Sequence, residues 1–266
     1  METVLLLRSF GDFVIALYHL AATNSNKPCR LIASKHLEPL NQSLFPFLTP
    51  AQQSVQFLDL GIQHQLLSGF TNRYFFTKGN LQELKNLRKQ IGGLGDLVLE
   101  QDKNAWLIRW ACKRNFTTVH QAGNIYDSWA KFYQHKTTTK AHSIAYQSAL
   151  IFPDSRLKRK VIPEKVLVKL EHQLNAVGIK TKRAYFKKGG IGNGYQNFTE
   201  LVNLIAESEY VISSDSLPAH IAQLLQKPHT IIYANKMNEE WITPYARVHR
   251  TAYTFEEILN DKQPTL

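Results

Sequence analysis

The chain of 266 residues contains only two cysteines, Cys29 and Cys112. Two cysteines are too few for a disulfide-rich secreted domain, so we expect free thiols rather than a disulfide. The sequence also lacks any apolar run near the ~20 residues that a membrane-spanning helix needs. Its opening Met1-Glu2 has no basic region ahead of the short apolar run that follows, which excludes an ordinary secretory signal. These absences predict a cytoplasmic protein.

Several motifs of nucleotide and metal enzymes are missing as well. No Gly-x-x-x-x-Gly-Lys-Ser/Thr sequence occurs, which excludes a P-loop kinase. The glycines of Gly190-Ile-Gly192-Asn-Gly194 do not keep the Gly-x-Gly-x-x-Gly spacing and come late in the chain, which argues against a dinucleotide oxidoreductase. Histidines and cysteines show no zinc spacing, and there is no Asp-x-Asp. We therefore predict neither a metal nor a cofactor.

The charge that is present is mainly positive. The net charge is +11, and residues 1–140 hold 16 basic and 9 acidic side chains, so the excess is not confined to a tail. A diffuse positive field suits phosphate-bearing partners such as nucleic acid, an anionic membrane surface or a phosphorylated glycolipid. Denser basic runs at 156–160 and 180–188 could face such a partner, but solvated charges of loops and helix ends explain them equally well. Without a recognisable binding module or an aromatic-basic stripe, nucleic acid is the least favoured of these partners.

The length admits either two compact domains or one large domain, and we take two as the working assumption. Alternating apolar strands and helices favour an α/β fold with a parallel sheet. Polar residues between 131 and 142 interrupt the apolar pattern, so we expect an N-terminal domain over 1–140 and a C-terminal domain over 141–266. Each reads as a Rossmann-like unit with a parallel sheet. The expected strands are 3–7, 30–33, 55–58, 97–99, 143–149, 179–186, 210–213 and 230–234, and the expected helices are 13–22, 81–90, 104–114, 163–177, 198–208, 216–226 and 255–259.

The segment from Val211 to Pro228 is the most informative in the chain. A buried strand ends in polar residues and passes directly into a helix, which would direct the unpaired N–H groups of the helix at the carboxyl edge of the sheet. Such a place binds anions. Asp215 is expected to cap the helix and Pro218 to lie in its first turn. Helix capping alone would account for Asp215, and His220 taken alone would be a packed core histidine.

This segment resembles the Asp-Thr-Gly-Pro-Met-His signature of the heptosyltransferase family of glycosyltransferases. The resemblance implies that Asp215 contacts hydroxyls of the donor sugar, that Ser216 lies beside the diphosphate and that His220 lies near the phosphates. Leu217 stands where the family has glycine, and its backbone N–H remains available to the diphosphate.

Two further segments are similar to the same family. The opening strand followed by Gly11-Asp12 resembles the family's Gly-Asp turn, whose aspartate is the proposed catalytic base; a helix N-cap is the structural alternative for Asp12. The run Lys158-Arg-Lys160-Val-Ile162-Pro163 resembles the Lys-x-Trp-Pro loop, with Ile162 in place of tryptophan. Lys160 then corresponds to the phosphate-binding lysine, which would neutralise charge on the departing nucleoside diphosphate.

The resemblance implies a GT-B fold with a donor cleft between two Rossmann-like domains and a shortened N-terminal domain. It implies an inverting, metal-independent glycosyltransferase that moves a sugar from a nucleotide-sugar donor, with an ADP-sugar favoured, to a glycan or lipid-linked acceptor in cell-envelope polysaccharide synthesis. A lipid-linked acceptor would bring the protein into peripheral contact with the inner membrane. The alternative is a degenerate family member that binds a nucleotide or glycan without catalysis.

Overall fold

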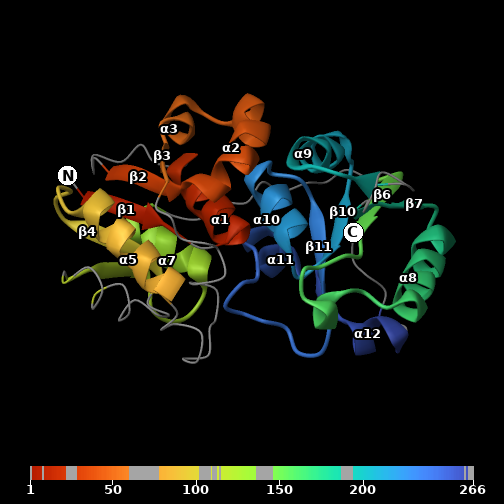
Figure 1. Cartoon of the computed structure of the whole chain (residues 1–266). Coiled ribbons are helices and arrows are strands. Elements are labelled where there is room, and N and C mark those ends of the chain that lie inside the picture. Colours follow the sequence, from red (N-terminus) through yellow and green to blue (C-terminus); the bar gives the residue numbers. More distant parts are fainter. Residues whose placement is uncertain are drawn as a thin grey trace. The chain divides into compact units, whose positions relative to one another are not determined.

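The computed structural model describes residues 2–7, 9–21, 29–59, 78–101, 109, 113, 115–135, 146–186, 194–260 and 262. The chain packs as two compact units, Met1–Lys136 and Thr137–Leu266, and each is described by itself (Figure 1). The boundary expected after residue 140 falls in 136–145, outside the described residues. The described ranges include no helix long and apolar enough to cross a membrane.

Unit 1 is built around a parallel sheet with the strand order β3-β2-β1-β4-β5. Its elements are β1 (Glu2–Leu6), α1 (Phe10–Ala21), β2 (Cys29–Ser34), η1 (Lys35–Leu37), α2 (Glu38–Leu44), η2 (Phe45–Phe47), α3 (Pro50–Gln53), β3 (Gln56–Leu58), α5 (Lys78–Ile91), β4 (Leu97–Gln101), β5 (Thr117–His120) and α7 (Ile125–Phe132). The central strands β1 and β4 are buried almost throughout, as continuous apolar runs in a parallel sheet predict.

Unit 2 contains a second parallel sheet, with the order β12-β11-β10-β6-β7. Its elements are β6 (Ser148–Phe152), η3 (Lys158–Lys160), α8 (Glu164–Ala176), β7 (Lys180–Arg183), β8 (Tyr185–Phe186), β9 (Gly194–Tyr195), α9 (Phe198–Glu207), β10 (Val211–Ser214), α10 (Leu217–Leu224), β11 (His229–Tyr233), α11 (Pro244–His249), β12 (Ala252–Thr254) and α12 (Phe255–Leu259). The short strands β8 and β9 pair with each other, apart from the main sheet.

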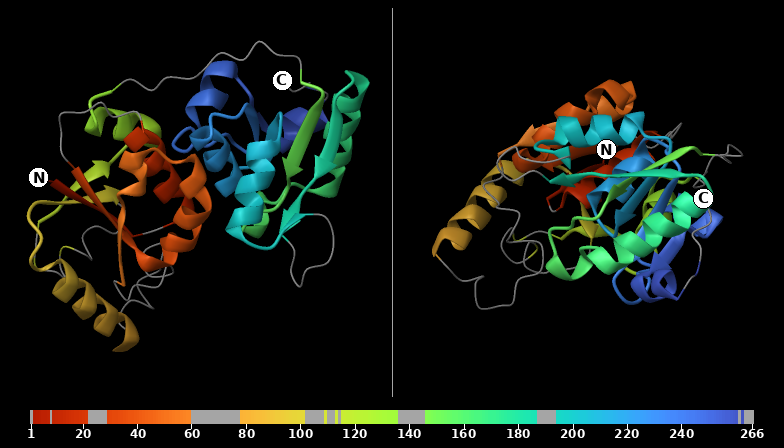
Figure 2. Two further views of the ribbon diagram at one scale, coloured as in Figure 1. Left: turned by 90° about the horizontal axis from the view of Figure 1, so that it is seen from above. Right: turned by 90° about the vertical axis from the view of Figure 1, so that its right-hand side faces the viewer.

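Strand alternation divides the core of unit 2 between the two faces of its sheet. Ile232 of β11 packs in a cluster with residues of α8 and α12, and Figure 2 shows α8 running alongside the strands at that end of the sheet. The preceding residue Ile231 points to the other face, where it joins Ala219 of α10 and Ala246 of α11. Helix α10 is thereby fixed against the sheet by side chains next to its N-terminus.

Most of the expected elements are confirmed, and two of them need correction. The strand expected at 143–149 is β6, which lies over Ser148–Phe152 because the apolar run Ala149–Phe152 is the part buried in the sheet. The strand expected at 179–186 is divided in two, since Ala184 donates to Ile151 O (2.8 Å) and the chain then leaves the main sheet.

Other expectations fall where the structure gives no description. Helix 104–114 lies outside the described residues except for Arg109 and Lys113, and the glycine-rich loop does so except for Gly194. Both cysteine side chains also lie outside them. By contrast, the apolar stripe expected in the helix over 163–177 is confirmed, because Val166, Leu170 and Leu174 are all buried in α8.

Candidate functional site

The candidate site of unit 2 lies where the strand order of its sheet reverses. From β6 the chain turns outward to β7, whereas from β10 it continues in the opposite direction to β11, so β6 and β10 flank the switch point. Their register aligns Ser213 with Phe152. The loops after both strands therefore emerge side by side at the carboxyl edge, where parallel α/β sheets bind their ligands.

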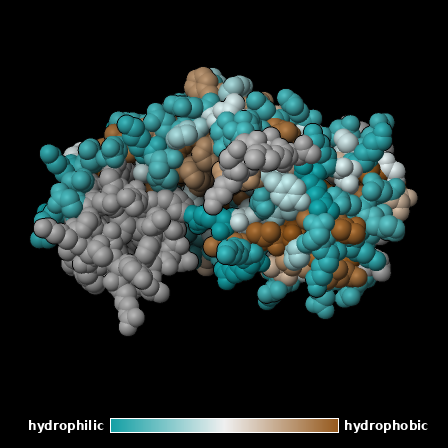
Figure 3. Space-filling model, turned by 45° about the vertical axis from the view of Figure 1, so that its right-hand side comes forward, coloured by the Kyte–Doolittle hydropathy of each residue, from teal (hydrophilic) through white to brown (hydrophobic). Residues whose placement is uncertain are grey.

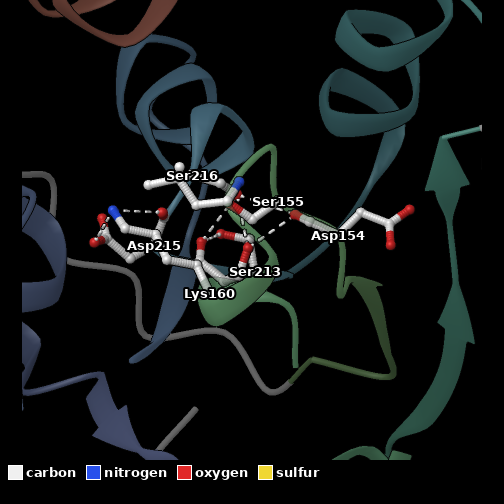
Figure 4. A network of polar contacts seen from close by, with 8 residues as sticks. Asp154, Ser155, Lys160, Ser213, Asp215 and Ser216 are labelled. Carbon is white, nitrogen blue, oxygen red and sulfur yellow. Dashed lines mark hydrogen bonds and ion pairs between the residues drawn. The ribbon is translucent and has the colours of Figure 1, made fainter. Parts of the chain in front are cut away.

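The loop after β6 supplies a cation and the loop after β10 supplies a carboxylate. Lys160 Nζ lies 2.6 Å from Asp215 Oδ2 and also donates to Asp215 O at 3.3 Å. The Asp215 side chain is only 9% exposed and the Lys160 side chain is 29% exposed. The two residues are 55 positions apart in the chain, so the fold brings together the two predicted donor-binding residues from separate motifs (Figure 4).

Three short polar contacts fix the geometry of these loops. Ser214 Oγ donates to Asp154 O at 2.9 Å, and the hydroxyls of Ser214 and Ser216 are 2.9 Å apart. Asp154 in turn accepts a hydrogen bond from Phe186 N on its Oδ2 at 2.9 Å. In Figure 4 Ser216 lies near the backbone of Asp154, whose carboxylate points away from it. This network ties the loop after β6 and the end of β8 to the segment that leads into α10.

The N-terminus of α10 differs from the expectation in one respect. Its N-cap is Ser216 rather than Asp215, and no side-chain capping hydrogen bond is formed. The expected capping role of Asp215 is therefore wrong, because its carboxylate faces Lys160 while the Ser216 hydroxyl faces Asp154. Pro218 lies in the first turn, as expected, and Leu217 is the first helical residue. The first backbone N–H of the helix thus lies next to the Lys160–Asp215 pair.

His220 lies one turn further along α10 and is 6% exposed. Burial lowers its pKa to about 4; the negative charge of Asp215 opposes this shift, and the positive charge of Lys160 reinforces it. At neutral pH the imidazole is accordingly uncharged. It can serve as a hydrogen-bonding group next to an anion, but it does not add a positive charge to the site.

Burial also lowers the pKa of His229 to about 4. Both histidines have an ordinary pKa near 6.5 when the chain is unfolded, so between pH 6.5 and 4 the unfolded chain binds protons that the folded chain does not. As the pH falls from 6.5 to 4, we expect the free energy of unfolding to decrease by up to about 1.4 kcal/mol per pH unit for each histidine.

Urea unfolding at pH 7.5 and pH 5 measures this effect. His220→Gln should reduce the pH dependence, whereas His172→Gln, at an exposed position of α8, should leave it unchanged. Equal unfolding free energies of the native chain at the two pH values would contradict the assignment.

Unit 1 carries the predicted base at its own switch point. In the order β3-β2-β1-β4-β5, the reversal lies between β1 and β4. Asp12, which is 4% exposed, lies in the first turn of α1 directly after β1. Gln101, the last residue of β4, donates from Nε2 to Asp12 Oδ1 at 2.5 Å. The carboxyl ends of the two flanking strands therefore meet at this side chain.

Ser9 holds the other oxygen of the same carboxylate. Ser9 Oγ donates to Asp12 Oδ2 at 2.8 Å, Ser9 N approaches the same atom at 3.4 Å, and Asp12 N approaches Ser9 Oγ at 3.3 Å. This reciprocal pattern is that of a capping box, with Ser9 as the cap and Asp12 three residues into the helix. The structural alternative of Asp12 as the N-cap is thus wrong. Both oxygens of the Asp12 carboxylate are thus held in place, one by Gln101 and one by Ser9.

Sequence reasoning missed several residues that border these sites. Phe186 is 53% exposed and its ring lies edge-on to that of Tyr195, with centroids 5.7 Å apart. Burial and, to a lesser degree, the charge of Asp154 raise the pKa of Tyr195 to about 12. In β11, burial and the charge of Asp215 raise the pKa of Tyr233, so its phenol stays protonated. A correct end for β6 would have indicated Asp154, because polar residues that follow a parallel strand lie at the binding edge.

Metal ligands do not gather in the described ranges: no group of three or more His, Cys, Asp or Glu side chains could hold a metal ion there. At the carboxyl edge of unit 2, the Lys160 ammonium and the partial positive charge of the α10 N-terminus could face an anion.

Comparisons with known proteins bear on this arrangement. Residues 193–259, which include Asp215 and His220, match the family model for glycosyltransferase family 9 (heptosyltransferase). The family resemblance noted in the sequence is confirmed over this segment. The comparison with curated proteins gives no match.

Solved structures give a match over almost the whole chain. E. coli heptosyltransferase WaaC with ADP-2-deoxy-2-fluoro heptose is similar with a TM-score of 0.57 and 12% identity, over 96% of this chain and 92% of that chain. E. coli ADP-heptose lps heptosyltransferase II gives 0.53 and 12%, over 95% and 89%. A family 9 glycosyl transferase from Veillonella parvula gives 0.57 and 11%, over 99% and 90%. At these identities the likeness shows the fold, and the chain has a GT-B-like architecture of two Rossmann-like units.

Proposed function

We propose that the chain is an inverting, metal-independent glycosyltransferase that moves a sugar from a nucleoside diphosphate sugar to a glycan or lipid-linked acceptor. The observation that carries this proposal is the Lys160–Asp215 pair at the N-terminus of α10, on the β6/β10 switch point. A cation, a helix N-terminus and a buried carboxylate in one place suit a ligand that joins a diphosphate to a polyhydroxylated sugar.

Each group has a role that its chemistry permits. Lys160 and the first N–H groups of α10 hold the diphosphate, and they stabilise the negative charge that grows on it as the bond to the sugar breaks. Ser216 lies beside the diphosphate, and the backbone N–H of Leu217 faces it. Asp215 accepts hydrogen bonds from donor-sugar hydroxyls, and neutral His220 supports the phosphates from within the helix. Each of these groups belongs to unit 2.

Asp12 is the proposed base. It accepts the proton of the acceptor hydroxyl while that oxygen attacks the anomeric carbon, and the nucleoside diphosphate leaves from the opposite face. Attack from the face opposite the leaving group inverts the configuration at the anomeric carbon. Gln101 and Ser9 keep the carboxylate oriented toward the carboxyl edge of the unit 1 sheet.

The proposed donor is an ADP-sugar, an ADP-heptose being favoured, and the proposed setting is the cytoplasmic face of the inner membrane in cell-envelope polysaccharide synthesis. Support for the sugar and base comes from the similar solved structures, one a heptosyltransferase with ADP-2-deoxy-2-fluoro heptose and another an ADP-heptose heptosyltransferase. The family model match in unit 2 supports the same donor class.

The exposed ring of Phe186 is proposed to stack on the nucleobase, since it lies next to Asp154 and hence next to the diphosphate loops. Phe186→Ala should weaken binding of a nucleoside diphosphate about five-fold or more, because base–aromatic stacking contributes about 1–3 kcal/mol. Binding of inorganic pyrophosphate should not change, because it has no base. Calorimetric titration of both ligands separates the two cases, and equal losses for both would reject the stacking role.

The activity itself is tested by nucleoside diphosphate release. The chain would be incubated with ADP-, UDP- and GDP-sugars together with a phosphorylated lipid-linked glycan acceptor. Release that requires both a nucleotide sugar and the acceptor is the expected result. Tight binding of a nucleotide sugar without release, across all acceptors, would instead favour the alternative of a family member that binds without catalysis.

A further inference from the structure

Asp154, in the loop after β6, connects two parts of the candidate site in unit 2. Its backbone oxygen accepts a hydrogen bond from Ser214 Oγ at 2.9 Å, and Ser216 Oγ approaches the same atom at 3.5 Å. Its carboxylate points away from Ser216 (Figure 4) and accepts a hydrogen bond from Phe186 N on Oδ2 at 2.9 Å. Asp154 therefore contacts the segment proposed to hold the diphosphate through its backbone, and the residue proposed to stack on the base through its side chain.

Only one oxygen of the Asp154 carboxylate is bound within the described part of the chain. The residue is half-buried, and among the described residues nothing donates to its Oδ1 and no cation pairs with it. An ionised carboxylate has about four lone-pair sites for hydrogen bonds, so several remain for a ligand. A diphosphate does not suit them, because it is negatively charged and its oxygens are acceptors. Hydroxyl groups do, since they donate.

Aromatic side chains border the Asp154 carboxylate. The ring of Tyr195 contacts those of Phe152, at the end of β6, and Phe186, with centroids 6.0 Å and 5.7 Å away. Phe186 is one of the few large hydrophobic side chains exposed in the described ranges. On the face drawn in Figure 3, hydrophobic residues gather in a few limited groups among hydrophilic ones. An exposed ring next to a carboxylate suits a nucleoside, whose base stacks and whose ribose donates hydrogen bonds.

The order of groups in a nucleotide matches the order of these contacts. In a nucleoside diphosphate the ribose joins the base to the phosphates, so a side chain between the base-stacking residue and the diphosphate segment faces the ribose. We propose that Asp154 binds the ribose hydroxyls and makes the site select ribonucleotides over deoxyribonucleotides. Carboxylates at strand ends bind ribose hydroxyls in dinucleotide-binding α/β folds. The inference rests on the proposed function and adds to it a residue that recognises the pentose.

The test is calorimetric titration with ADP, UDP and GDP and with the 2′-deoxy and 3′-deoxy forms of each. The native chain should bind its best ribonucleotide at least about ten-fold more tightly than one of the deoxy forms, a difference of about 1.4 kcal/mol, because a charge-assisted hydrogen bond is lost. In Asp154→Asn this ratio should fall to about three-fold or less, since a neutral amide replaces the carboxylate. Asparagine keeps the size of the side chain and an oxygen for Phe186 N.

The matched control is Glu207→Gln, which removes the same charge from an exposed position at the end of α9 and should keep the native ratio. Inorganic pyrophosphate has no ribose, so Asp154→Asn should bind it no more weakly than the native chain does. Thermal unfolding without ligand checks that both variants fold.

Three outcomes would overturn the inference. Equal binding of ribonucleotides and both deoxy forms by the native chain would reject ribose recognition while nucleotide binding, and with it the proposed donor class, still stands. Equal weakening of all forms in Asp154→Asn, with an unchanged ratio, would leave Asp154 only the role of holding Phe186. Absence of binding by every nucleoside diphosphate would reject the proposed function together with the inference.

Discussion

Asp12→Asn is expected to lower turnover by about 10²–10⁴-fold, the usual contribution of a general base. Asparagine keeps the size of the side chain and one oxygen for the donors of Ser9 and Gln101, but it cannot accept the acceptor's proton. Affinity for the nucleotide sugar should stay within a few-fold of the native value, because the proposed donor groups lie in unit 2. Steady-state release of nucleoside diphosphate and calorimetric donor binding are the two measurements.

The matched control for this variant is Asp127→Asn, which changes an exposed aspartate in the first turn of α7 in the same unit. It should leave turnover unchanged. Native-like turnover of Asp12→Asn would reject Asp12 as the base. A parallel loss of turnover and folding, seen in the thermal unfolding midpoint, would assign the residue to the capping box of α1 instead.

Lys160→Ala is expected to weaken binding of nucleoside diphosphates by about ten-fold or more, since a charge-assisted contact to phosphate is lost. The substitution also leaves the buried carboxylate of Asp215 beside the diphosphate without its cation, which adds repulsion. Thermal stability without ligand should fall too, because the buried Asp215 carboxylate has lost its partner cation. Calorimetric titration with ADP, UDP and GDP measures the first effect and thermal unfolding the second.

Lys158→Ala is the control, because Lys158 is an exposed lysine of the same basic turn. It removes the same charge from the chain and should change neither quantity. Equal losses of affinity for Lys158→Ala and Lys160→Ala would mean that the overall positive charge, and not a specific contact of Lys160, causes the binding. In the double variant with Asp215→Ala, part of the stability lost in Lys160→Ala should return, because the unpaired carboxylate is gone.

The sequence singled out the residues of the candidate site, but not the contacts between them. Lys160 and Asp215 were both identified through short motifs, and Asp12 through its turn. That Lys160 pairs with Asp215 could not be read from the sequence, because it follows from the parallel register of β6 and β10. The expected capping role of Asp215 was wrong for the same reason: its carboxylate pairs with Lys160, which lies in the loop after β6.

The residues that sequence reasoning missed depend on exact strand ends. Asp154 was missed because the strand before it was placed too early in the sequence. Phe186 was missed with it, since its backbone N–H donates to the Asp154 carboxylate. Gln101 lies just beyond the strand expected at 97–99, whereas β4 extends to Gln101 and its amide reaches Asp12. The strand order determines which side chains at the ends of parallel strands lie next to one another, and local periodicity does not specify that order.

Unit 2 is proposed to bind a nucleoside diphosphate sugar at the β6/β10 switch point. The most direct measurement is the thermal unfolding midpoint of the native chain, Lys160→Ala and Asp215→Ala with a panel of nucleoside diphosphates, nucleotide sugars and pyrophosphate. A ligand at 100 times its dissociation constant adds about 2.7 kcal/mol of apparent stability. We predict stabilisation of the native chain by nucleoside diphosphates of one base, reduced in both variants. No stabilisation by any ligand in the panel, or stabilisation that both variants retain in full, would contradict the account.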